Sequence, residues 1–535
     1  MSDENEIIGG ANLRRREFLV GGAAVGAAVA LPLNYAAMAR SASFPAAKGG
    51  KFAHGVSSGF PTSKAITLWT RVSDLDRTSR LTVEVAKDKD FRKVVKRAQV
   101  TAGKHQDYTV HERITGLKPG HQYYYRFETK DKNSQVGKFR TLPPADSKQP
   151  LKIAYFSCQD YEAGYFNAQA AMAKEDVDLV ICLGDYIYEH TYYDGPADRE
   201  DTTGTNHDGD VQTLAEFREK YHFYQSDKQL QALHAAHPWI TIWDDHEVED
   251  NYAGDEADSK QNDPHLENSG YPRRVPFQRR RRNGYKAYFE AHPRLQQKGM
   301  TADQIYGSIR LGGLAELFLT DQRQYRDPQP CEDGILVPCS DAEAAGRTFL
   351  GADQKKWFKK AVPASSAKWK LWASELMVMS VDAPAPGQAA ILDSWDGYQA
   401  ERGEILSKWK DEDLKNLVVL TGDIHTFIAG DLTTTGRQGG DPIGVELVGG
   451  SATSLGLPEY LGVPSAVLEA LQVANDPHIK YANYDRRGYA VMSVDKNKIK
   501  CEYKAVDALT KGATATETLA TFQIDSGDPT LHQLT

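Results

Sequence analysis

Residues 178–189 read DLVICLGDYIYE, an unbroken apolar run that stops at a glycine and an aspartate. Such a run, bounded by turn-forming residues, is typical of a strand buried on both faces of a sheet. A carboxylate directly behind the strand lies at the carboxyl edge of the sheet, where open α/β proteins bind their ligands. The stretch therefore predicts an α/β fold with a candidate site that begins at Asp185.

The same pattern of an apolar strand followed by polar donors recurs three times along the chain. The other three stretches are IAYFSCQD at residues 153–160, WITIWDDHE at 239–247 and NLVVLTGDIH at 416–425. They place a thiol, carboxylates and imidazoles behind buried strands; these donors are Cys158, Asp244, Asp245, His246, Glu247, Asp423 and His425. So many like charges repel one another unless cations compensate them, so the four stretches together predict a metal centre.

Each stretch alone has a simpler interpretation. Free cysteines are usually buried structural residues, Gly184-Asp185-Tyr186 suits an ordinary turn, and residues 244–247 could be a solvated acidic loop. The prediction of a metal centre rests on the occurrence of the same strand-then-donor pattern in four stretches of one chain.

The chain divides into two regions of different periodicity. Short alternating stretches from residue 51 to 141 predict a β-sandwich, with strands at 65–72, 81–86, 108–114 and 121–129. Beyond a linker at 142–146, continuous apolar strands alternate with helical stretches, which indicates a layered α/β domain. The expected strands are 153–156, 179–183, 240–243, 317–319, 369–373 and 417–420, and the expected helices are 165–174, 214–224, 229–236, 282–292 and 353–361.

The order of the four stretches resembles the calcineurin-like metallophosphoesterase superfamily. The pairing of GDYIYE at 184–189 with WDDHE at 243–247 is more similar to the PhoD-type alkaline phosphatase and phosphodiesterase family. Residues 116–125 resemble the late strand of a fibronectin type III-like sandwich. The resemblance implies four segments: a twin-arginine signal peptide at 1–39, an N-terminal β-sandwich at 48–144, a metallophosphoesterase catalytic domain at 150–510 and a C-terminal extension at 511–535.

The resemblance also implies the metals. Cys158, Asp185, Tyr188 and His425 match iron-binding positions of the family, where thiolate and phenolate suit Fe³⁺. Asp245 and Asp423 match positions at neighbouring Ca²⁺ sites, and Asp244 and Asn251 are further candidates, since Ca²⁺ prefers oxygen ligands. The resemblance further implies that Asp185 is a carboxylate shared between two ions, so we expect it to bridge them.

Other residues are expected to act on the substrate. His246 matches a histidine that contacts phosphate or protonates the leaving group, and Arg323, Tyr325 and Asn251 are candidate substrate contacts. A histidine ligand of the wider superfamily has no counterpart in WASE at 372–375 or DSWD at 393–396. An oxygen-rich second metal site follows, with Asp393 and Asp396 as candidate outer groups.

These residues imply a secreted alkaline phosphatase or phosphodiesterase. A metal-activated water or hydroxide would attack phosphorus and release phosphate from extracellular organic phosphate. Two alternatives stay open at this point: a phospholipase D-like phosphodiesterase, and a non-catalytic secreted protein that only holds metal. The second would be favoured by loss of Asp185, Asp245 or His425, and all three are present.

The N-terminus predicts export. Residues 14–19 read RRREFL, an apolar run follows to residue 33, and AMA at 37–39 provides a cleavage site. The run is shorter than the roughly 20 residues of a membrane-spanning helix. We therefore expect the twin-arginine machinery as a partner, a periplasmic or extracellular location and no stable membrane span. The net charge of −9 argues against specific nucleic-acid recognition.

Three further features are expectations of smaller reach. Cys331 and Cys339 bracket a polar loop and are the best candidates for a disulfide in an exported chain. The insertion at 191–211 could be a lid over the site. An arginine run could guide a polyanionic substrate or could pair with nearby acids around 249–258; it comprises Arg273, Arg274, Arg279, Arg280, Arg281 and Arg282.

Overall fold

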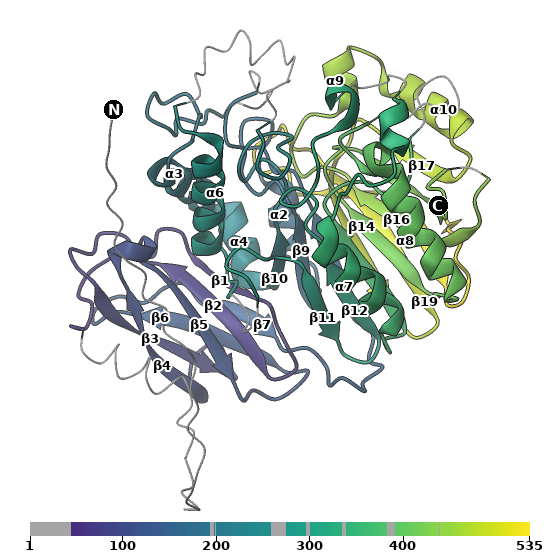
Figure 1. Ribbon diagram of the computed structural model, residues 1–535. Helices are drawn as coiled ribbons and strands as arrows, with labels where there is room; N and C mark the ends of the chain where they lie inside the picture. The colour runs from purple at the N-terminus through teal and green to yellow at the C-terminus, as the bar shows by residue number, and fades with distance from the viewer. Residues whose placement is uncertain are drawn as a thin grey trace, which may run out of the picture.

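The computed structural model describes residues 44–192, 197, 199–257, 274–295, 300–333, 339–381, 391–437 and 439–535 (Figure 1). The twin-arginine segment expected at 1–39 lies outside them, as does Arg273. Among the described helices, none is long and apolar enough to cross a bilayer.

Three parallel strands at the centre of the molecule follow the expected apolar runs. These are β8 (Leu151–Phe156), β9 (Leu179–Leu183) and β10 (Pro238–Ile242), and β9 lies between the other two. Every residue of β9 and β10 is buried, because both faces of the sheet are covered. The prediction of buried α/β strands is confirmed here.

The central strands belong to a ten-stranded sheet of order β21-β20-β19-β18-β8-β9-β10-β1-β2-β5. The remaining members are β1 (Val56–Gly59), β2 (Ala65–Arg71), β5 (Thr109–Thr115), β18 (Arg487–Val494), β19 (Lys498–Val506), β20 (Thr516–Asp525) and β21 (His532–Gln533). A seven-stranded sheet has the order β11-β12-β13-β14-β16-β15-β17. Its members are β11 (Gly307–Leu311), β12 (Ala315–Leu319), β13 (Trp369–Ser374), β14 (Leu417–Thr421), β15 (Phe427–Thr433), β16 (Pro442–Gly449) and β17 (Ile479–Asn483).

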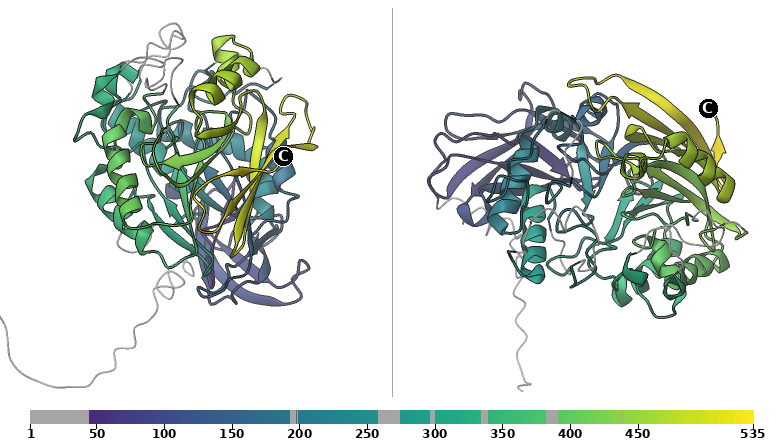
Figure 2. Two further views of the ribbon diagram at one scale, coloured as in Figure 1. Left: turned by 90° about the vertical axis from the view of Figure 1, so that its right-hand side faces the viewer. Right: turned by 90° about the horizontal axis from the view of Figure 1, so that it is seen from above.

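The two sheets pack face to face and helices cover their outer sides (Figure 2). One hydrophobic core joins residues of both sheets, such as Ile153 and Leu371. A second core joins Trp372 to Phe358 and Trp409 on the helices outside the seven-stranded sheet. The helices are α2 (Asn167–Met172), α3 (Leu214–Ser226), α4 (Lys228–Ala236), α6 (Phe277–Ala291), α7 (Gly351–Ala364), α8 (Gln399–Asp411), α9 (Leu457–Leu461) and α10 (Ser465–Asn475). The layered α/β prediction is thus confirmed.

The N-terminal unit has its own hydrophobic core between two layers of strands. One layer is a four-stranded sheet of β4 (Val94–Ala102), β3 (Ser79–Ala86), β6 (Gln122–Glu128) and β7 (Gly137–Arg140). At its corner, the backbone N–H of Lys118 donates to the Tyr123 hydroxyl at 3.0 Å. The other layer consists of β1, β2 and β5, and it is not a separate sheet, because β1 pairs in parallel with β10. That pairing satisfies the open edge of β10, a feature that the sequence did not indicate.

The C-terminal residues continue the ten-stranded sheet. The segment 511–535, expected as an extension, contributes β20 along the whole length of β19 and then β21. Its inner face supplies Phe522 and Ile524 to the main core. Truncation before residue 511 would therefore expose core side chains.

The expected disulfide and the arginine run both lie in the described part of the chain, apart from Arg273. Cys331 and Cys339 form the expected disulfide. In the arginine run, Arg280 pairs with Glu249 at 2.6 Å and Arg281 with Asp255 at 2.5 Å, which is the pairing with nearby acids. Arg279 and Arg282 remain exposed.

The described part of the 191–211 insertion is anchored to helix α3. The buried Lys220 ammonium donates to Asp201 at 2.6 Å and to the Gly209 carbonyl at 2.7 Å. Arg274 adds an ion pair to Asp210 at 2.9 Å. These residues are fixed to the body of the protein, and the lid hypothesis gains no support from them.

Buried neutral histidines lie where the N-terminal unit meets the central strands of the ten-stranded sheet. His234 on α4 contacts the hydroxyls of Ser57 and Tyr186, each at 2.8 Å, and stacks on Trp239. Burial lowers the pKa of His234 to about 3 and that of His111 to about 4. Because the folded-state pKa values lie below the ordinary value of 6.5, the unfolded chain takes up protons first as the pH falls.

We therefore expect the free energy of unfolding to fall as the pH drops from about 6.5 toward 4, by up to ~1.4 kcal/mol per pH unit for each such histidine. Urea unfolding at several pH values measures this loss. His234→Gln should reduce the slope, and substitution of the exposed His105 by Gln serves as the matched control. Equal slopes in the parent and His234→Gln would contradict the assignment.

Candidate metal centre

The donor side chains come from loops that follow four parallel strands. Cys158, Asp185, Asp244 and Asp423 each stand two residues beyond the end of β8, β9, β10 and β14, respectively. Parallel strands bring their carboxyl ends to one edge of a sheet, and the two packed sheets bring both edges together. The repeated strand pattern thus becomes one site.

The backbone at this site is held in an uncommon conformation. Cys158, Asp185, Asp423 and His425 all have positive φ angles, between 53° and 68°. Residues other than glycine pay roughly 1–2 kcal/mol for the left-handed region, so the surrounding structure must enforce it. A Cβ on Gly184 would overlap the Asp244 side chain, which explains the glycine before Asp185.

A buried glutamate ties two of the loops together. The Glu247 carboxylate accepts from the backbone N–H groups of Asp244 and Tyr186, each at 2.8 Å, and of Asp185 at 3.2 Å. Its side chain is fully buried. Glu247 therefore fixes the loop after β9 against the loop after β10, which positions the carboxylates of both.

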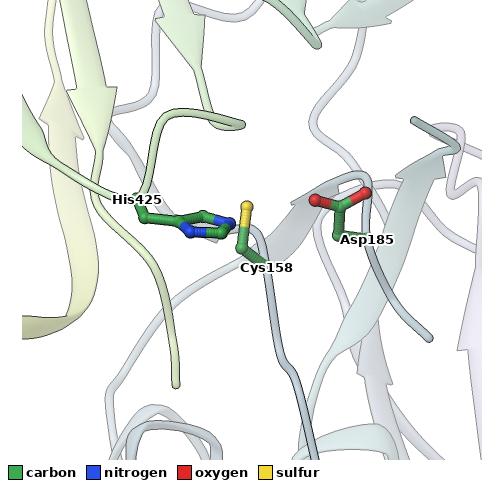
Figure 3. A group of neighbouring side chains, drawn as sticks. All are labelled: Cys158, Asp185 and His425. Atoms are coloured by element: carbon green, nitrogen blue, oxygen red, sulfur yellow. The ribbon is translucent and has the colours of Figure 1, made fainter. Parts of the chain in front are cut away.

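The first donor cluster combines sulfur, nitrogen and oxygen. Cys158, Asp185 and His425 each offer one atom, and these atoms lie within 4.8 Å of one another. Figure 3 shows the Cys158 sulfur between the imidazole of His425 and the carboxylate of Asp185. The Tyr188 hydroxyl joins them, at 3.1 Å from His425 Nε2 and 3.4 Å from Asp185 Oδ2. All four residues expected to bind one ion are thus adjacent.

Two further clusters among the described residues share members with the first. One contains Asp185, Asp245 and His246, and the other contains Asp244, Asp245 and Asp423. Asp185 and Asp245 each belong to two clusters, as bridging carboxylates do. The third cluster has oxygen donors alone, the kind that Ca²⁺ prefers.

A buried guanidinium lies among these carboxylates. Arg323 forms ion pairs with Asp244, with Asp393 at 2.6 Å, with Asp423 at 2.9 Å and with Asp245 at 3.5 Å. Its Nη1 also donates to the Asn251 amide oxygen at 3.4 Å. Arg326 pairs with the other oxygen of Asp393 at 2.7 Å, so Asp393 holds both guanidinium groups in place.

Two arginines do not neutralise the whole site. Burial raises the pKa of the Cys158 thiol well above its usual value, and the Asp185 carboxylate raises it further. Burial likewise raises the pKa of Asp185 and of Asp423, and neighbouring carboxylates add to the shifts. Asp185 Oδ1 and Asp244 Oδ2 also have no hydrogen-bond partner among the described residues. Unpartnered oxygens and a thiol that can ionise only beside a cation fit a metal centre.

The histidine of the second cluster is oriented by a glutamate. His246 Nδ1 lies 2.8 Å from Glu189 Oε2, and its ring stacks on that of Tyr188. The other Glu189 oxygen accepts from the Asp250 backbone N–H at 2.9 Å and from the Tyr192 hydroxyl at 2.6 Å. Burial alone would lower the pKa of His246, but Asp245, Glu189 and Asp185 raise it well above its usual value. These carboxylates therefore favour the protonated form of His246.

Two of the expected residues lie elsewhere. The Tyr325 ring packs edge-on against Tyr306, and no contact in the described part of the chain links it to the donor clusters. The Asp396 carboxylate accepts from Arg402 at 2.8 Å and from Ser380 at 2.6 Å, so it supports the loop after β13. The sequence indicated no role for Glu189, and it placed Glu247 among the donors of the metal centre. None of the three clusters contains Glu247, whose carboxylate binds backbone N–H groups instead.

Comparison with known proteins agrees with this geometry. The profile of the PhoD-like phosphatase family matches residues 153–503, and that of the PhoD-like phosphatase N-terminal domain matches residues 37–143. Alkaline phosphatase D of Bacillus subtilis (strain 168) is 36% identical over 487 residues, which cover 88% of this chain and 80% of that protein.

Solved structures give the same relationship. The structure of PhoD superposes with a TM-score of 0.80 at 33% identity and covers 92% of this chain and 93% of its own. A purple acid phosphatase from yellow lupin (Lupinus luteus) seeds has a TM-score of 0.52 at 11% identity, with 88% of this chain and 73% of that chain covered, and shares the fold. The expected resemblance is therefore confirmed: the chain belongs to the PhoD-like phosphatase family.

Proposed function

We propose that this phosphatase is a metal-dependent alkaline phosphatase and phosphodiesterase that releases phosphate from organic phosphate outside the cytoplasm. The observation that carries the proposal is the linkage of three donor clusters through Asp185 and Asp245 at the strand ends. Linked sites of this kind place cations close enough to act on one phosphate group. The export signal at 1–39 and the twin-arginine machinery as its partner are part of the proposal.

The donor chemistry favours Fe³⁺ in the first cluster and Ca²⁺ in the third. Cys158, Tyr188 and His425 offer thiolate, phenolate and imidazole, a set that suits iron better than Ca²⁺. Asp244, Asp245 and Asp423 offer oxygen alone, which suits Ca²⁺. When bound, such ions supply Lewis acidity and an activated water for ester hydrolysis.

The protein's own side chains would then handle charge and protons. Arg323 is fully buried and pairs with Asp393 on one side and with Asp244 and Asp423 on the other. With cations bound to Asp244 and Asp423, that second side of the guanidinium would be released toward phosphate oxygens, while Asp393 holds it in place. His246 carries a proton that it can give to the departing alkoxide, and Glu189 holds the imidazole in the required orientation. The described contacts of Tyr325 do not support its expected role at the substrate.

The purified full chain should hydrolyse both a phosphomonoester and a phosphodiester. Asp185→Asn removes a candidate ligand that two of the donor clusters share. We therefore expect both activities to fall by more than about 100-fold, a larger loss than follows when only a hydrogen-bond partner of a metal ligand is removed. Steady-state rates with nitrophenyl phosphate and bis-nitrophenyl phosphate measure this. Cleavage of neither ester by the parent protein would refute the proposed function, and the ratio of the two rates decides between monoesterase and diesterase.

The metal assignment predicts different behaviour for two ligand variants. Tyr188→Phe should remove a visible tyrosinate-to-iron absorption, because the phenolate is its source. Cys158→Ala should lower the iron content and diminish that absorption less. Metal analysis by mass spectrometry beside absorption spectra measures both. Unchanged iron in both variants would remove these residues from the ligand set, and loss of calcium without loss of iron would reverse the assignment of the clusters.

The Glu189 contact predicts a leaving-group effect. Glu189→Gln keeps the shape of the side chain but weakens its hold on protonated His246, so kcat should fall by about 10- to 100-fold with alkyl phosphates. The loss should be smaller with nitrophenyl phosphate, whose leaving group needs less protonation. The exposed Glu200, changed to Gln, is the matched control. An equal loss on both substrates at unchanged metal content would contradict the role in proton transfer.

A further inference from the structure

A cavity of about 540 Å³ lies between the N-terminal unit and the edge of the seven-stranded sheet. Residues that follow β1 and residues of β2 and β5 form one wall, β11 forms the opposite wall, and the linker at 143–145 closes an end. None of its lining residues belongs to the donor clusters. Pockets of this size at a junction between two units commonly hold small molecules.

Arg113 on β5 brings an uncompensated positive charge to the cavity. Its Nη1 donates to the Phe60 carbonyl at 2.6 Å and to the Thr67 hydroxyl at 3.1 Å. Its Nε and Nη2 have no partner, and no carboxylate forms an ion pair with it, within the ranges that the structure describes. Burial lowers the pKa of Arg113, with no opposing contribution from an acidic side chain. Most half-buried arginines in the described part of the chain pair with a carboxylate. Arg113 does not, so its guanidinium can pair with the anionic group of a bound ligand.

A second guanidinium faces the cavity from the opposite wall. Arg310 on β11 donates through Nε to the Gly312 carbonyl at 2.7 Å and through Nη1 to Glu316 at 3.2 Å. Its Nη2 makes no hydrogen bond with the described residues. The Glu316 carboxylate offsets part of its charge, so Arg113 is the stronger anchor and Arg310 assists it.

The remaining walls are largely apolar. Phe60, Pro61, Pro143 and Ile309 line them. Phe60 has a φ angle of 47°, and the guanidinium of Arg294 lies 4.6 Å from its ring centroid, so its position is fixed. An inorganic anion would leave these apolar side chains exposed to water, whereas an anion with an apolar body would bury them.

We propose that this cavity is a second binding site, for a small organic anion that carries an oxyanion group on an apolar body. One side of the oxyanion pairs with Arg113, and the opposite side of the oxyanion pairs with Arg310. The apolar body of the ligand lies against Phe60 and Ile309. The ligand bridges the N-terminal unit and the catalytic domain, so its binding stabilises their junction. The site does not depend on the metal centre.

Fluorescence titration of the metal-loaded full chain with anilinonaphthalene sulfonate tests the proposal, since this probe combines an aromatic body with a sulfonate. We expect saturable binding to one site and a rise in Tm with probe concentration. Arg113→Met should weaken binding by about tenfold or more, because the charge-assisted hydrogen bonds are lost. Arg113→Lys should retain part of the affinity, and the exposed Arg77, changed to Met, should leave it unchanged.

A second variant does not depend on the charge. Ser63 lines the cavity and makes no side-chain hydrogen bond with the described residues, so Ser63→Trp fills the space without removing a contact. It should abolish the probe signal and leave nitrophenyl phosphate hydrolysis unchanged, which also shows that the variant is folded. Parent-like binding in both Arg113→Met and Ser63→Trp would overturn the proposal. Competitive inhibition of hydrolysis by the probe would also overturn it, because that result places the probe at the metal centre.

Discussion

The structure depends on the compensation of buried negative charge at the ends of its parallel strands. Four carboxylates and a thiol meet where the two sheets converge; Cys158, Asp185, Asp244 and Asp245 are almost fully shielded from water, and Asp423 is partly buried. Like charges at this separation cannot all ionise in a protein interior unless cations stand between them. Arg323 and Arg326 supply part of that positive charge, and the donor clusters are arranged so that metal ions supply the rest.

The fold delivers this arrangement with little freedom to change it. The buried central strands fix the point in the sheet at which each donor loop begins. Glu247 connects two of these loops by accepting hydrogen bonds from three backbone N–H groups. Positive φ angles at Cys158, Asp185 and His425 then turn the side chains toward one another. The free-energy cost of this backbone strain is offset by favourable packing in the surrounding structure, as is usual at preorganised functional sites.

Local chemistry explains what the sequence could and could not predict. The proximity of the candidate ligands Cys158, Asp185 and His425 was predictable because each follows an apolar strand, and a strand fixes where its end lies. Glu189 had no expected role and Glu247 was expected among the metal donors, because the contacts that both make with another loop arise only in the tertiary structure. The pairing of β1 with β10 and the entry of β20 into the sheet are long-range strand contacts, which periodicity does not encode.

Cations should make the buried carboxylates compatible with the fold. Calorimetric Tm values of the metal-loaded and chelator-treated protein, with and without Asp185→Asn, measure this dependence. In the loaded protein Asp185→Asn should lower Tm, because a shared ligand is lost. In the chelated protein it should raise Tm, because Asp185 then has a raised pKa from burial and an unpartnered oxygen. A chelator that leaves Tm unchanged, or a substitution that lowers Tm in both forms, would contradict the account.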